Sequence, residues 1–93
     1  MTPEERNSVI AELAQIRFET ITTPTHSAWE WDANTKRSHR SSDILHDVKV
    51  RFGADVSQEI FRAYRAKSDE MLVAAGWEVD PNRNTWRKKQ VWY

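Results

Sequence analysis

The chain has 93 residues, no cysteine, and as many acidic as basic residues, so its formal net charge at pH 7 is zero. This length predicts a single domain, residues 1–93, and the lack of thiols excludes disulfides, thiolate metal sites and thiol catalysis. No run approaches the roughly 20 apolar residues that span a bilayer, and the acidic start MTPEER does not resemble an export signal. We therefore expect a cytoplasmic protein without a membrane partner.

The first predicted helix runs from Pro3 to about Phe18. Thr2 can cap its start, Pro3 suits the first helical position, and Glu5 completes a capping box. Apolar residues then recur at helical spacing and predict one buried face. The threonines before Pro24 are expected to end the helix, because β-branched residues and the residue before proline disfavour it.

The next stretch predicts extended structure followed by a loop. In residues 28–32, Trp29 and Trp31 alternate with Glu30, which is the period of a short strand. Residues 33–40, ANTKRSHR, have no apolar periodicity and predict an exposed loop.

Two further helices are expected. Ser41 or Ser42 can cap the second, and Gly53 ends it where a left-handed residue is favoured. Asp55 can cap the third, which Gly76 ends, so this helix is predicted to be the longest element.

The closing stretch predicts a β-hairpin. Residues 77–79 alternate, residues 80–84 are rich in turn formers, and residues 85–93 form the return strand. The predicted fold class is therefore α+β and mainly helical, with three helices and a C-terminal hairpin. An all-α bundle with extended termini is the alternative.

The hairpin carries an unusual concentration of aromatic and basic side chains, for which two interpretations remain open. In one, the hairpin tryptophans pack over the long helix and complete the core, since an indole can bury on the order of 200 Å². In the other they form a binding surface, because tryptophan and arginine dominate protein-binding hot spots. The candidate partner-binding residues are Trp86, Trp92, Arg83, Arg87, Lys88 and Lys89.

A second basic segment, KRSHR, spans residues 36–40. It is either a solvated loop or a phosphate clamp assisted by the amino terminus of a helix starting near Ser42. The candidate phosphate contacts are Lys36, Arg37, His39 and Arg40.

Catalytic and metal sites are not indicated. His39, Asp43 and His46 have helical spacing, but no recognised ligand motif or fourth ligand accompanies them. No nucleophile elbow or glycine-rich phosphate loop is present. We expect no enzyme activity, no metal and no cofactor.

These observations together predict a small non-catalytic protein-binding module that acts as a regulator, inhibitor or adaptor. Viral or mobile-element accessory factors are one setting that this composition suits. The alternative is a nucleic-acid-binding protein that uses residues 36–40 and 83–89 with tryptophan stacking. Homodimerisation through the third helix is a further expectation.

Overall fold

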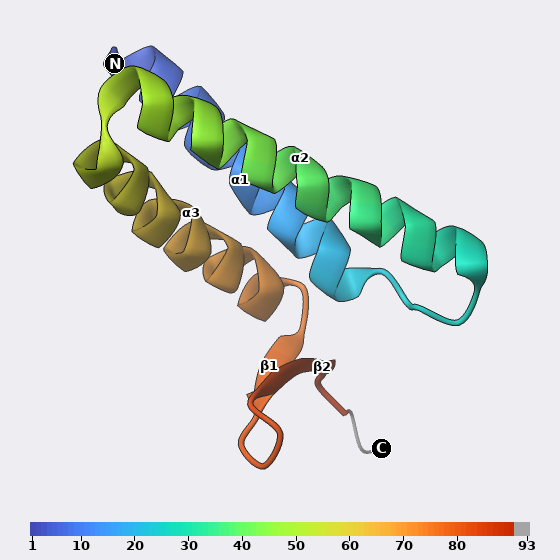
Figure 1. Cartoon of the computed structure of the whole chain (residues 1–93). Coiled ribbons are helices and arrows are strands. Elements are labelled where there is room, and N and C mark those ends of the chain that lie inside the picture. The colour runs from blue at the N-terminus through green and yellow to red at the C-terminus, as the bar shows by residue number, and fades with distance from the viewer. Residues whose placement is uncertain (91–93) are drawn as a thin grey trace.

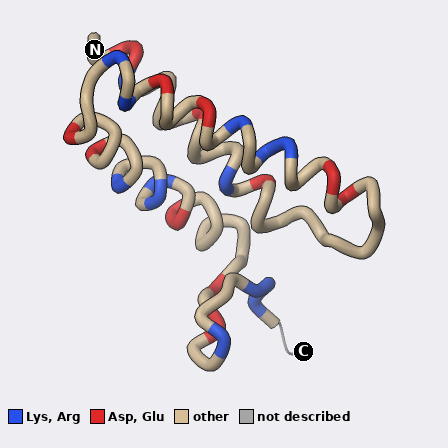
Figure 2. Tube along the Cα trace, viewed as in Figure 1, with Lys and Arg blue, Asp and Glu red and all other residues tan. Residues whose placement is uncertain are grey.

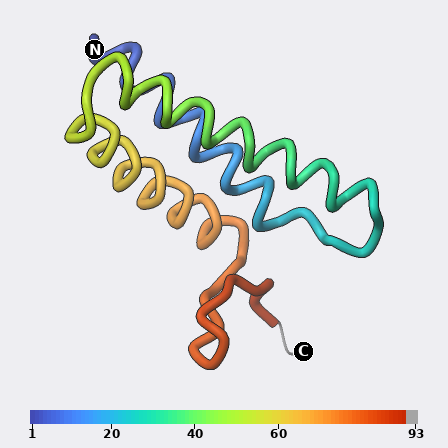
Figure 3. The backbone as a smooth tube through the Cα atoms, viewed as in Figure 1, coloured from blue at the N-terminus to red at the C-terminus, as the bar shows by residue number. Residues whose placement is uncertain are grey.

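The structure is a computed structural model that describes residues 1–90 (Figure 1). Three helices are followed by a two-stranded antiparallel hairpin, which confirms the predicted α+β, mainly helical fold class. The first and third helices point the same way and the second runs against them (Figure 3). The elements are α1 (Pro3–Thr22), α2 (Ala28–Phe52), α3 (Ala54–Ala74), β1 (Trp77–Asp80) and β2 (Thr85–Lys88).

Helix α2 differs most from expectation. The predicted strand at residues 28–32 and the predicted loop at residues 33–40 are both wrong, because these residues form the first half of α2. Ser27 Oγ accepts the Glu30 N–H at 3.2 Å and donates to the Glu30 carboxylate at 2.9 Å. This capping box starts the helix and outweighs the short tryptophan alternation. With 25 residues against 21 in α3, α2 and not the third helix is the longest.

Contacts with α1 explain why the polar first half of α2 is helical. Arg37 pairs with Glu19 at 3.4 Å and Arg40 pairs with Glu12 at 2.7 Å, so both cations face a neighbouring helix. Lysine and arginine also have good helix propensity. The predicted helix start at Ser41 or Ser42 is therefore wrong, because the helix begins more than three turns earlier.

Helix α1 ends later than predicted. It continues beyond Phe18 to Thr22, because the hydroxyls of Thr20 and Thr22 donate to carbonyls four residues earlier, both at 2.8 Å. These bonds hold the threonines within the helix. The helix stops when Thr23 turns extended before Pro24, as the proline predicts.

The two glycines mark the helix ends as expected. Gly53 alone separates α2 from α3, and Gly76 follows the end of α3. Their φ angles are 99° and 88°, a backbone region that glycine adopts at little cost. Both positions were identified from the sequence as stops.

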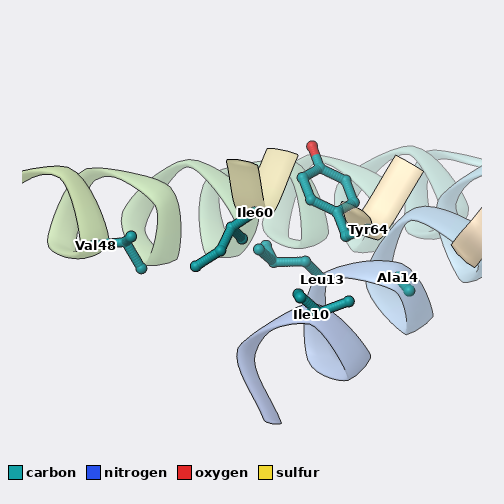
Figure 4. Packing of buried hydrophobic residues seen from close by; sticks show 6 residues of the cluster. All are labelled: Ile10, Leu13, Ala14, Val48, Ile60 and Tyr64. Atoms are coloured by element: carbon teal, nitrogen blue, oxygen red, sulfur yellow. The ribbon is translucent and has the colours of Figure 1, made fainter. Parts of the chain in front are cut away.

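The hydrophobic core is small and mostly aliphatic. Leu13, Ile60 and Leu72 have no exposed surface. None of the tryptophans in residues 1–90 is buried, so the interpretation in which these indoles complete the core is wrong for them. Figure 4 shows the principal cluster, formed by Ile10, Leu13 and Ala14 of α1, Val48 of α2, and Ile60 and Tyr64 of α3.

The molecule is elongated. Its principal extents are 49 × 28 × 23 Å and its radius of gyration is 14.8 Å, against about 12 Å for a compact domain of this length. Its accessible surface is 6867 Å², whereas a compact monomer of the same mass exposes about 5600 Å². The fold therefore leaves an unusually large surface open for contact.

Candidate binding surfaces

The hairpin separates its side chains onto two faces. In the antiparallel register, Trp77 lies opposite Lys88 and Val79 lies opposite Trp86, so these four residues share one face. The other face holds Glu78, Asp80, Thr85 and Arg87. Figure 1 shows the hairpin beyond the carboxyl end of α3 rather than over its side. The strands therefore do not lie over the side of α3 as predicted, although β1 contacts α3 and Trp77 and Trp86 are half-buried.

The basic residues of the hairpin fall into two groups. Arg87 pairs with Glu78 and Asp80, both at 3.2 Å, so its guanidinium holds the two strands together. Arg83, Lys88 and Lys89 are exposed and make no ion pair with any residue in 1–90. Trp92, also a candidate partner-binding residue, lies outside the described residues.

Asp80 organises the hairpin turn. Its carboxylate accepts the Asn82 N–H at 2.9 Å, and this hydrogen bond, assisted by the nearby Arg87, lowers the pKa of Asp80. A lowered folded-state pKa means that the carboxylate stabilises the hairpin above its unfolded pKa of about 3.9. That contribution is lost as the pH falls through the lowered pKa.

We expect acidification from about pH 6 to about pH 2 to open the turn of the wild-type hairpin. The measurement is the shift of the Trp86 indole N–H in NMR spectra. Asp80→Asn keeps an acceptor for the Asn82 N–H but cannot titrate, so it should lack the Asp80 transition. Identical titration curves for the two proteins would contradict this role for Asp80.

The KRSHR segment lies on α2 and is not a loop. Each of its three permanent cations has a carboxylate partner within the chain: Lys36–Asp32 at 3.2 Å, Arg37–Glu19 at 3.4 Å and Arg40–Glu12 at 2.7 Å. His39 is exposed on the same helix. The predicted clamp with a helix amino terminus near Ser42 is wrong, because α2 is continuous there. The charges of this segment are largely used to attach α2 to α1.

His39, Asp43 and His46 are all exposed on α2. In residues 1–90 no group of three histidine, cysteine, aspartate or glutamate side chains is arranged to hold a metal ion.

Trp29 and Trp31 are the functional candidates that sequence reasoning missed. Their exposed fractions are 77% and 61%, the first and fourth largest among the exposed large hydrophobic side chains of residues 1–90. At about 100° per residue, helical positions two apart lie about 200° apart, so the indoles occupy opposite flanks of the first turn of α2. The capping box of Ser27 and Glu30 was the available signal, because it predicts a helix and hence diverging tryptophans.

At least two grooves indent the helical surface of residues 1–90. The larger, about 420 Å³, lies between the first half of α1 and the second half of α2. We call it the acidic groove; its lining includes the apolar residues Val9, Ile44, Val48 and Phe52 and the acidic residues Glu5, Glu12, Asp43 and Asp47. The smaller, about 250 Å³, includes Ile16, Ser41 and Tyr64. Burial raises the pKa of the Tyr64 phenol above its ordinary value.

No helix in residues 1–90 combines the length and the apolar character that a bilayer crossing demands. The absence of enzyme activity and of a cofactor stays a prediction. Comparisons of the chain with protein-family models, with curated proteins and with solved structures each find no match.

Proposed function

We propose that this protein is a small non-catalytic binding module that acts on a protein partner as a regulator, inhibitor or adaptor. Its primary contact is the amino-terminal end of α2, where Trp29 and Trp31 project into solvent. The hairpin is a secondary contact through Trp86 and through Arg83, Lys88 and Lys89, which make no ion pair with residues 1–90. The sequence alone predicted that the partner binds mainly at the hairpin, whereas this proposal places the main contact on α2.

The observation that carries the proposal is the 77% and 61% exposure of Trp29 and Trp31. An indole outside the core exposes apolar surface to water, which is unfavourable. Burying that surface against a partner therefore lowers the free energy of the complex. Tryptophan is also the residue type most enriched among interface hot spots. Two such side chains on one short segment therefore favour a contact function.

A protein partner is favoured over a nucleic acid because most of the candidate phosphate-binding lysine and arginine side chains are already in ion pairs. Nucleic-acid affinity comes mainly from lysine and arginine that neutralise phosphates. Four of the cations expected to do this, Lys36, Arg37, Arg40 and Arg87, pair with carboxylates of the chain itself. The alternative of nucleic-acid binding is supported only at the hairpin, by Arg83, Lys88 and Lys89 beside two half-buried indoles.

The test is to identify the partner by affinity capture from a nuclease-treated host extract and then to measure its affinity calorimetrically. We expect Trp29→Ala and Trp31→Ala each to weaken binding by about 10- to 100-fold, the range of hot-spot truncations. Because both side chains are exposed, the circular dichroism melting curves should stay close to wild type.

Val50→Ala is the matched control, because Val50 is 69% exposed at the other end of the same helix. Wild-type affinity in both tryptophan variants would refute the proposed surface. Loss of capture after nuclease treatment, with salt-sensitive binding of single-stranded DNA, would favour the nucleic-acid alternative instead.

A further inference from the structure

We propose that the protein associates with itself head to tail, with the hairpin of one molecule docking in the acidic groove of a second copy. This inference does not rest on Trp29 and Trp31, the primary contact of the proposed function, but it places the hairpin, the secondary contact, against a second copy of the chain. It rests on the opposite charges of the acidic groove and the hairpin, which lie too far apart to contact each other within one molecule.

The acidic groove keeps an excess of negative charge after its internal pairs are counted. Glu12 pairs with Arg40 at 2.7 Å and Asp47 pairs with Arg51 at 3.4 Å. Glu5 and Asp43 make no ion pair with a residue in 1–90, and the one further lining cation is the amino-terminal ammonium of Met1, so the lining keeps an excess of one negative charge. Between these charges lie partly buried apolar side chains. The groove therefore suits an occupant that is both cationic and apolar.

The hairpin has this combination. Lys88 shares its face with Trp77, Val79 and Trp86, and Val79 is 45% exposed. Lys89 follows directly, and Lys88 and Lys89 have no ion-pair partner in residues 1–90. The long lysine side chains can reach carboxylates at a groove edge while their methylene stems cover apolar surface.

The two surfaces lie at opposite ends of the molecule. The groove is built from the start of α1 and the end of α2, whereas the hairpin follows the far end of α3 (Figure 1). Figure 2 shows the basic residues of the second strand well away from the chain start. They can therefore pair only between molecules. A net charge of zero also removes general repulsion between copies.

Contact between two different surfaces is heterologous and does not end with a dimer unless the geometry closes a ring. We therefore expect the weight-average mass in sedimentation equilibrium to rise from 11.0 kDa as the protein concentration increases. Association should be strong at about 50 mM salt and weak at about 500 mM, because salt screens exposed charges.

Charge reversal gives the sharpest test. Asp43→Lys/Asp47→Lys removes the acidic groove and Lys88→Glu/Lys89→Glu removes the basic hairpin, so each variant alone should stay monomeric. Their equimolar mixture should regain association, because the unchanged basic hairpin of the first variant fits the unchanged acidic groove of the second, and the reversed hairpin and the reversed groove are again opposite in charge. The control is Glu59→Lys/Glu70→Lys, at two exposed positions of α3. It changes the net charge as the groove variant does, and it should associate like wild type.

Circular dichroism of each variant establishes that it is folded. A wild-type protein that remains at 11.0 kDa at low salt would overturn the proposal. So would a mixture that fails to associate, or a control that disrupts association as strongly as the groove variant. Capture of an unrelated protein by the groove of a monomeric wild type would also overturn it.

Discussion

Replacing Leu13 by alanine is expected to lower the free energy of unfolding by about 2–5 kcal/mol, the largest effect of any single substitution considered. Leu13 is fully buried in a cluster with only a few other buried side chains, so its removal leaves a cavity that little else can fill. A domain of this length has a total stability of roughly 5–14 kcal/mol. The variant should therefore unfold at markedly lower urea concentration, as followed by circular dichroism.

Val73→Ala is the control for this prediction. Val73 is also aliphatic and lies in a helix, but 63% of its surface is exposed. Its replacement should change stability by no more than about 0.5 kcal/mol, as is usual at the surface. If the two variants unfold at the same urea concentration, the small aliphatic cluster does not hold the three helices together.

Arg17→Met is expected to destabilise the protein by about 1–3 kcal/mol, because it removes a largely buried charged hydrogen-bonding group. The Arg17 guanidinium donates to Ser68 Oγ at 2.7 Å, to Asp69 Oδ1 at 2.6 Å and to the Arg65 carbonyl at 3.2 Å. Its side chain is only 15% exposed. These bonds fasten the second half of α1 to α3, so hydrogen exchange should accelerate at the carboxyl end of α3.

Arg51→Met provides the comparison. The Arg51–Asp47 pair lies within one helix, at 3.4 Å, with both side chains more than half exposed. Its loss should cost about 0.5 kcal/mol or less. A double-mutant cycle of Arg17 with Asp69→Asn separates their coupling from lost packing. A coupling energy near zero would show that the aliphatic stem of Arg17, and not its charge, stabilises the contact.

The candidate surfaces were only partly predictable. The hairpin and its turn at residues 80–84 follow from the sequence, whereas the register that puts Trp77 and Val79 on the same face as Lys88 and Trp86 comes from the structure. The pairing of Arg87 with Glu78 and Asp80 follows from that register. The exposure of Trp29 was not predictable in this way, because a tryptophan is ordinarily assigned to the core of a small domain. Likewise, the acidic groove requires two helices far apart in sequence to lie side by side.

The sequence by itself determined the elements whose signals are local: the Thr2 cap, the glycine stops at residues 53 and 76, and the hairpin turn. Such signals act within a few residues, so no partner segment is needed to interpret them. The Ser27–Glu30 capping box is a local signal for a helix start there, but only the tertiary structure decided that the helix continues through residues 33–40 and that Trp29 and Trp31 face solvent. The polar run there has no apolar stripe of its own, and it is held against α1 through Glu12 and Glu19, contacts that exist only once the chain has folded.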